Sequence, residues 1–148
     1  MADPMELFRL YKDDIYRFAL SYTHSREDAE DICQTVFEQL MRHPSITPGK
    51  EKAWLMQTCA NRCKNLLRSH WWSRTTPLED VHSVPGQETD PVRDAVMALK
   101  PEYRAVIYLY YYEGYTTEEI GRLLRISQSA VSTRLHRARQ QLKQELEE

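Results

Sequence analysis

The stretch EEIGRLLRISQSAVSTRLHRAR, residues 118–139, joins a compact apolar cluster to a basic segment. A short helix, a tight turn and a longer helix make up a helix-turn-helix motif, and this stretch fits that plan. Gly121 is the small residue that would let the two helices approach each other. The apolar wedge between the helices is expected to consist of Ile120, Leu124, Ile126, Val131 and Leu135.

The second helix of this motif is expected to present a polar and basic face to solvent. Short polar side chains near its N-terminus can read base edges, while arginines can reach guanine or phosphates. The residues of this face are Gln128, Ser129, Ser132, Thr133, Arg134, His136 and Arg137. A helical hairpin with a basic outer surface is the alternative, but the lack of acids between positions 120 and 144 favours DNA binding.

Charge is distributed unevenly along the 148 residues, although the formal net charge is only −2. Residues 51–74 carry a net +4 and residues 121–143 a net +6, whereas residues 75–120 carry −6. Two basic segments are typical of a polyanion-binding protein with two contact surfaces. Alternation of charged helix faces would produce the same pattern, so charge alone leaves both interpretations open.

Apolar residues recur at helical spacing through most of the chain, and no segment alternates with the period of a strand. Residues 73–90 contain two prolines and no helical stripe, which predicts a flexible linker. The fold class is therefore all-α, with two small helical domains at residues 1–72 and 91–148. The helices are expected to begin near residues 5, 25, 51, 91, 101, 116 and 127.

Capping signals support several of these helix starts. Two motifs predict capping boxes, Ser25-x-x-Asp28 and Thr116-x-x-Glu119, in which a hydroxyl and an acid each bond the backbone of the other residue. The hydroxyl of Ser127 can cap the last helix by accepting a hydrogen bond from a backbone N–H of the first turn.

The third expected helix, residues 51–71, has two different faces at 100° per residue. One side is apolar, and the other carries cations, amides and an aromatic ring but no acid. Such a face suits an exposed nucleic-acid strand, with cations on phosphates and amides or rings on unstacked bases. Trp54 can equally be a residue at the edge of the core. The polar face consists of Trp54, Gln57, Asn61, Lys64, Asn65 and Arg68.

Catalytic and metal-binding signals are lacking in the sequence. Cys33, Cys59 and Cys63 lie on apolar stripes, where free cysteine behaves as a small hydrophobe, so we expect neither a metal nor another cofactor. We find no nucleophile–base set, Gly-rich phosphate loop or carboxylate pair, so we do not expect an enzyme. The odd cysteine count and the acidic N-terminus, which does not resemble a signal peptide, predict a cytoplasmic protein without membrane insertion.

Three segments together resemble extracytoplasmic-function (ECF) sigma factors of bacterial RNA polymerase. ALKPEYRAVIYLYYYEGYTTEEIGRLLRISQSAVSTRLHRARQQL resembles their region 4. SREDAEDICQTVFEQL resembles the polymerase-binding helix of region 2, and AWLMQTCANRCKNLLRSH resembles the helix that reads the −10 element. The resemblance covers about residues 5–72 and 91–145, in the family's order.

This resemblance implies a function and a set of partners. The protein would bind core RNA polymerase and promoter DNA, with residues 1–72 serving the polymerase and the −10 element and residues 91–148 the −35 element. The loop at about residues 43–50 would capture a flipped base. The family usually also has an anti-sigma factor as a partner.

The polymerase-binding residues that the resemblance implies lie on the second expected helix. An acidic helical face is usually just solvated, so without the resemblance these residues would carry no assignment. Thr35 stands where the family commonly has glutamate, a departure that bears on the strength of the contact and not on its existence. The implied docking residues are Asp31, Gln34, Thr35 and Glu38.

The residues expected to contact the −35 element are those named above on the last helix, together with Arg125 and Ser127 from the turn before it.

Arg125 departs from the family pattern. Relatives commonly have glycine at this turn, because the chain there takes a positive φ that glycine adopts freely. A residue with a β-carbon costs roughly 1 kcal/mol in that conformation. Arg125 therefore either strains the turn or imposes a different turn geometry, and its charge near the DNA backbone would be the compensation.

A second function remains open at this point: a self-sufficient helix-turn-helix regulator that binds duplex DNA as a dimer through its N-terminal helices. The third helix discriminates between the two, because a dimerisation domain has no use for a face of cations and amides.

Overall fold

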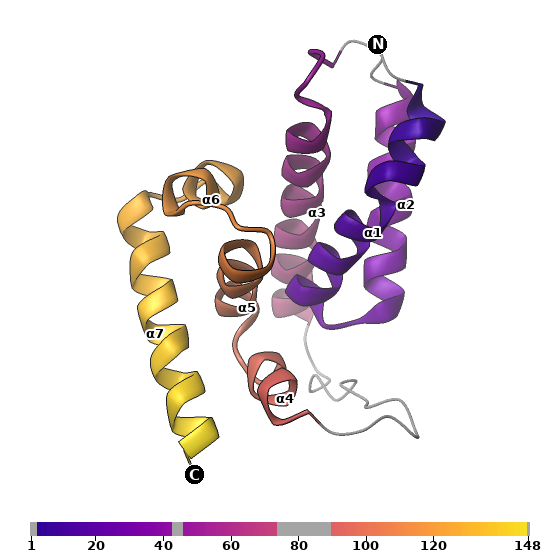
Figure 1. Cartoon of the computed structure of the whole chain (residues 1–148). Coiled ribbons are helices and arrows are strands. Elements are labelled where there is room, and N and C mark those ends of the chain that lie inside the picture. The colour runs from indigo at the N-terminus through magenta and orange to yellow at the C-terminus, as the bar shows by residue number, and fades with distance from the viewer. Residues whose placement is uncertain (1–2, 43–45, 74–89, 148) are drawn as a thin grey trace. The chain divides into compact units, whose positions relative to one another are not determined.

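The computed structural model describes residues 3–42, 46–73 and 90–147, which are helical and contain no strand. The chain divides into two compact units, Met1–Arg74 and Thr75–Glu148, and Figure 1 shows the helices of each. The all-α prediction is confirmed. Most of the expected linker, residues 74–89, and part of the expected base-capturing loop, residues 43–45, lie outside the described residues.

Three helices form the first unit, and their ends follow from local chemistry. The Asp3 side chain caps the first helix by accepting from the Met5 N–H, and the helix ends at His24, which has a φ of 57°. Ser25 Oγ accepts from the Asp28 N–H at 3.2 Å. The predicted capping box therefore has the bond from the Asp28 N–H to the Ser25 hydroxyl. The Ser25 N–H, which the box would direct to Asp28, lies instead 3.4 Å from Thr23 Oγ1. The helices are α1 (Pro4–Thr23), α2 (Arg26–Arg42) and α3 (Glu51–Ser73).

The core of the first unit lies where α1, α2 and α3 pack against one another. On α2 the helical spacing of apolar residues predicts a stripe from Ala29 to Met41; most of it is buried, but Met41 is 62% exposed. Each step of four residues moves 40° around the helix. Met41 lies two such steps beyond Cys33, which is half-buried, so its side chain has moved away from the centre of the buried face. The side chains that form the centre of this core are Ile15, Phe18, Val36, Leu40, Leu55 and Met56.

The second unit is built around its last helix, α7, against which α4, α5 and α6 all pack. The expected wedge is buried except for Ile126, which is half-buried. Arg104 is also in the core, where Nη1 donates to the Leu99 carbonyl at 2.5 Å and burial lowers its pKa to about 10. The helices are α4 (Pro91–Met97), α5 (Pro101–Ile107), α6 (Thr117–Leu124) and α7 (Gln128–Glu147).

The sequence predicts one helix from Pro101 that stops at Gly114, with Val106, Ile107, Tyr110 and Tyr111 on its apolar side, but the chain does not remain α-helical over this range. It passes into a π-helical turn, η1 (Tyr108–Tyr112), in which the Glu113 N–H reaches back to the Tyr108 carbonyl at 3.1 Å. A π-turn contains an extra residue and so rotates the side chains that follow it. Tyr111, expected on the buried side, is therefore 59% exposed.

The predicted capping box at the start of α6 is complete. Thr116 Oγ1 accepts from the Glu119 N–H at 3.1 Å, and Glu119 Oε1 accepts from the Thr116 N–H at 2.9 Å. The bond from the Thr116 backbone lowers the pKa of Glu119. Ser127 caps α7 as expected, since its Oγ accepts from the Ala130 N–H at 3.0 Å.

The turn between α6 and α7 depends on two residues. Arg125 adopts φ 60° and ψ 45°, the left-handed conformation in which side chains with a β-carbon are strained. The sequence leaves two possibilities open, a strained turn with a positive φ or a turn of different geometry, and the structure has the strained turn. A Cβ at Gly121 would lie 2.8 Å from the Ile126 carbonyl oxygen, so only glycine lets the turn cross α6 this closely.

Candidate nucleic-acid interface

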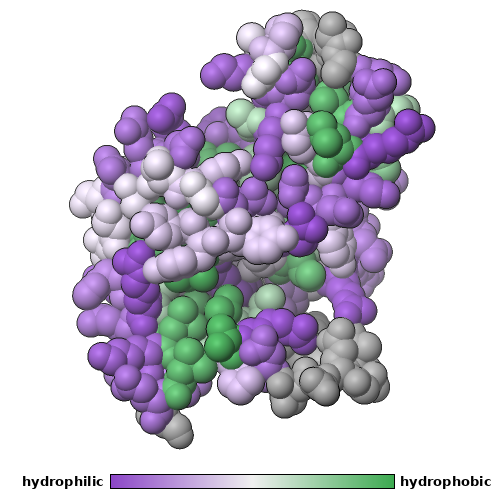
Figure 2. All heavy atoms as spheres, viewed as in Figure 1, coloured by the Kyte–Doolittle hydropathy of each residue, from purple (hydrophilic) through white to green (hydrophobic). Residues whose placement is uncertain are grey.

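The N-terminal half of α7 carries the face predicted to contact duplex DNA. Six of its seven expected residues are exposed: Gln128, Ser129, Ser132, Thr133, His136 and Arg137. In Figure 2 hydrophilic residues cover the outer edge of this helix, whereas hydrophobic residues gather beside its C-terminal half, where α4 packs. The two turn residues that precede the helix, Arg125 and Ser127, are exposed as well.

Arg134 differs from this expectation. Its side chain is only 26% exposed, and its Nη2 lies 3.6 Å from a carboxylate oxygen of Glu102 on α5. The sequence predicts the face of α7 on which Arg134 lies, but not the acid that the fold brings beside it. The ion pair competes with any phosphate for the Arg134 charge.

Arg139, two residues beyond Arg137, is held by aromatic side chains. Its Nε donates to the Tyr111 hydroxyl at 2.6 Å, and its guanidinium lies 5.5 Å from the ring centroids of both Tyr110 and Tyr111. Such cation–π contacts hold the guanidinium in place at modest energetic gain. The π-turn supplies the two rings, and no signal in the sequence predicts that arrangement.

The polar face of α3 forms the second candidate surface, in the first unit. Asn65 and Arg68 are exposed, and the other expected residues, Trp54, Gln57, Asn61 and Lys64, are half-buried. Gln57 Nε2 donates to Asn61 Oδ1 at 3.2 Å, so the side-chain amides of these two residues are held next to each other on this face. On the opposite side Leu55, Met56, Cys59 and Cys63 are fully buried. The helix therefore has one core face and one polar face, as its spacing predicts.

The residues predicted to dock on the polymerase lie along α2. Asp31, Gln34 and Glu38 are exposed, and Gln34 Nε2 donates to Glu38 Oε1 at 3.2 Å. Thr35 is half-buried and donates its hydroxyl to the Asp31 carbonyl at 2.9 Å. Its hydroxyl is therefore occupied by its own helix.

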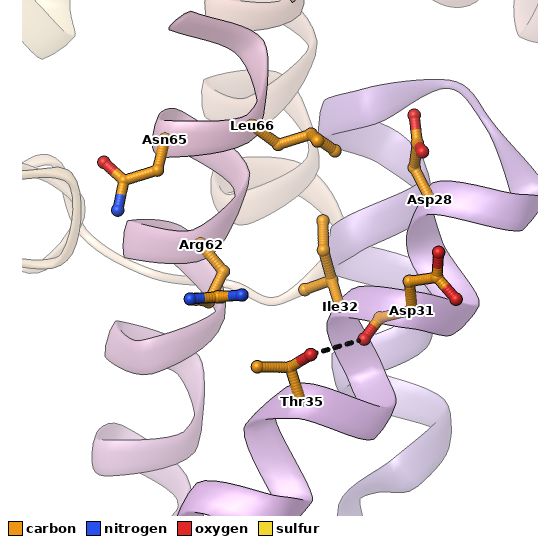
Figure 3. A pocket seen from close by; sticks show the side chains of 7 residues that line it. All are labelled: Asp28, Asp31, Ile32, Thr35, Arg62, Asn65 and Leu66. Carbon is orange, nitrogen blue, oxygen red and sulfur yellow. Dashed lines mark hydrogen bonds between the residues drawn. The ribbon is translucent and has the colours of Figure 1, made fainter. Parts of the chain in front are cut away.

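A pocket of about 290 Å³ lies between α2 and α3. Figure 3 shows Ile32 and Leu66 pointing toward each other across it, with Asp28 and Asp31 on the α2 side. Asp31 and Thr35, from the predicted docking surface, share this pocket with Asn65, from the predicted strand-binding surface. The remaining lining residue is Arg62, an exposed cation that the division of α3 into two faces overlooks.

The cysteines form no metal site with other ligand-type side chains among the described residues. A hydrogen bond with Cys63, followed by burial, raises the pKa of the Cys59 thiol well above its usual value. Cys59 is therefore protonated at neutral pH, and it packs in the core as a small apolar side chain. No described helix has the length and hydropathy of a membrane span.

A three-helix unit with a polar α3 face, followed by a helix-turn-helix unit, is the domain pair of sigma-70-type transcription factors. The sigma-70 region 2 family model matches residues 7–73, and the sigma-70 region 4 family model matches residues 89–142. The chain belongs to the family of ECF RNA polymerase sigma factors.

Individual relatives share this similarity along nearly the whole chain. SigE of Mycolicibacterium smegmatis is 32% identical over 93% of this chain, which spans 59% of that relative. SigM of Bacillus subtilis is 30% identical, with 93% of this chain and 91% of the relative covered. Among solved structures, the sigma factor RpoE of Bartonella quintana, crystallised with the anti-sigma factor NepR, matches with a TM-score of 0.78 at 20% identity, covering 97% of this chain and 96% of that one.

These comparisons confirm the predicted family and do not favour the dimeric regulator. They do not test the individual site residues, which remain predictions.

Proposed function

We propose that this chain binds core RNA polymerase in the bacterial cytoplasm, directs it to promoters through their −35 and −10 elements, and so starts transcription. The observation that carries the proposal is the polar face of α3, where Asn65 and Arg68 are exposed behind a fully apolar core face. Amides and cations without acids suit single-stranded DNA, whose bases can be stacked and hydrogen-bonded once the duplex opens.

Each surface has its own part in this proposal. The α2 face docks on the polymerase through Asp31, Gln34, Thr35 and Glu38. The α3 face holds the opened −10 strand through Trp54, Gln57, Asn61, Lys64, Asn65 and Arg68. The helix-turn-helix reads the −35 duplex through Arg125, Ser127, Gln128, Ser129, Ser132, Thr133, Arg134, His136 and Arg137, of which Arg134 also pairs with Glu102.

Transcription in vitro tests the proposal directly. The full chain is added to core bacterial RNA polymerase on a library of bacterial promoter fragments, and transcripts are compared with those from core alone. We expect specific start sites only when the chain is present. Tight, sequence-specific binding to duplex DNA by the chain alone, with no effect on the polymerase, would favour the dimeric regulator instead.

An anti-sigma factor is the partner that we propose for regulation, because the family commonly has one. A protein that covers the α2 face or the α7 face would block one of the surfaces above. Loss of initiation on adding such a protein, with recovery when it is removed, is the expected behaviour.

A further inference from the structure

A hydrogen bond joins the first residues of the two helices of the helix-turn-helix. Nε2 of Gln128, the first residue of α7, donates to Oγ1 of Thr117, the first residue of α6, at 2.8 Å. The two residues are eleven positions apart, so the bond depends on how the helices pack and not on local chain geometry. Thr117 is not among the residues that the sequence predicts to contact DNA.

Gln128 lies where a recognition helix meets the bases. It is exposed, and the N-terminal residues of the second helix are the ones that contact base edges in this motif. A glutamine amide has two N–H donors and a carbonyl acceptor. With one donor held by Thr117, the remaining N–H and Oε1 form a donor–acceptor pair in a fixed order, which matches N7 and the N6 amino group of adenine in the major groove.

Thr117 is well placed to hold this amide still. Its side chain is half-buried, and a β-branched side chain is stiff about χ1. The backbone around it is fixed by the capping box of Thr116 and Glu119. In the structure the hydroxyl accepts from Nε2; a hydroxyl can also donate to an amide oxygen, so the order presented to the base follows from this packed arrangement. Without the hydroxyl the amide loses its anchor and is free to turn over, which exchanges its oxygen and nitrogen.

We propose that Thr117 is a positioning residue for base reading, which fixes the Gln128 amide so that the motif selects adenine at one position of the −35 element. The inference rests on the proposed function, because it needs α7 to lie in the major groove. A bond with a purely structural role would affect the stability of the second unit and leave base preference unchanged.

The test measures base preference position by position. Holoenzyme, reconstituted from the full chain and core bacterial RNA polymerase, is mixed with promoter duplexes randomised across the −35 region, and the bound fraction is sequenced. We expect the wild type to prefer adenine roughly tenfold at one position. Thr117→Val keeps the shape but removes the acceptor, and it should lower that preference to about twofold or less while the other positions keep theirs.

Two further variants separate positioning from folding. Thr117→Ser, unlike Thr117→Val, keeps the hydroxyl and should keep most of the preference for adenine. Gln128→Ala should abolish the preference at the same position, and adding Thr117→Val to it should change nothing more. As a matched control, Arg137→Ala should weaken all sequences alike.

Three results would overturn the inference: full preference in Thr117→Val, equal loss at every position, or a lower melting temperature with an unchanged profile. A wild-type holoenzyme that is indifferent to the whole −35 region would overturn the proposed function, and the inference with it. That failure is distinguishable because it is seen before any substitution is made.

Discussion

Replacing Arg125 with glycine should stabilise the second unit and weaken its hold on DNA. Arg125 ends α6 with φ 60° and ψ 45°, and its side chain is exposed. The substitution therefore removes backbone strain without opening a cavity, and the neighbouring turn at Ile126 and Ser127 can stay as it is.

The expected gain is small but measurable. A β-carbon in the left-handed region costs roughly 1–2 kcal/mol. Glycine is more flexible in the unfolded chain, which takes back roughly 0.5–1 kcal/mol. The difference is centred on about 0.75 kcal/mol, and for a domain of about 60–100 residues this corresponds to a rise of about 3–6 °C in melting temperature.

The two units can be followed separately in the full chain. All three tryptophans lie within residues 1–74, so tryptophan fluorescence reports the first unit, while calorimetry registers both. Arg125→Gly should raise a calorimetric transition that fluorescence does not detect. His24→Gly is the matched control, because His24 also has a left-handed backbone, with φ 57°, but in the first unit; it should change only the transition that fluorescence follows.

The second half of this prediction concerns DNA. If Arg125 contacts a phosphate, Arg125→Gly holoenzyme should bind all promoter sequences more weakly by a similar factor. The slope of log affinity against log salt should fall by about one. A variant that melts lower, with promoter affinity and salt slope unchanged, would refute both the strain argument and the phosphate contact.

Five other substitutions test the remaining surfaces and the turn between α6 and α7. Asp31→Ala and Gln34→Ala should weaken association with core polymerase with little change in melting temperature, because both side chains are exposed; equal loss of helicity and binding in circular dichroism and pull-down would mean that they are structural. Asn65→Ala should reduce promoter opening in permanganate footprinting, whereas Arg137→Ala should reduce duplex binding in gel shifts, and identical effects would contradict the division between the two units. Gly121→Ala should cost roughly 1–3 kcal/mol of stability in a denaturant titration, since its Cβ would lie 2.8 Å from a backbone oxygen of the turn, and an unchanged midpoint would contradict that contact.

Periodicity and capping chemistry predicted much of the fold because both act locally. The spacing of apolar residues identified the core faces of α2, α3 and α7. The Thr116 capping box and the Ser127 cap form as expected. The resemblance to the family marked the turn at Arg125 as unusual, but the choice between a strained turn and a different turn geometry came from the structure, where Arg125 has a φ of 60°.

The features that could not be predicted all depend on contacts between elements distant in sequence or on a change of helix type. The π-turn at residues 108–112 leaves no mark in the spacing, yet it exposes Tyr111 and brings it to Arg139. The ion pair of Arg134 with Glu102 and the bond between Gln128 and Thr117 join separate helices. A helical wheel places each of these side chains on a face, but it does not give the partner.

These contacts change how the basic charge of the second unit should be counted. Residues 121–143 carry a net +6, but Arg122 pairs with Glu118 at 3.2 Å, Arg134 pairs with Glu102, and Arg139 is held by Tyr111. Among the described residues of this segment, the cations without such a partner are Arg125, Arg137 and Lys143. The two ion pairs place acids beside this segment, so the net charge that it offers to phosphates is smaller than +6, and the proposed duplex contact would release correspondingly fewer counterions. A weakly binding helix-turn-helix gains affinity from a second contact that is physically linked to it. On the proposed function, we therefore expect specific promoter binding only when the polymerase holds both surfaces on the same DNA.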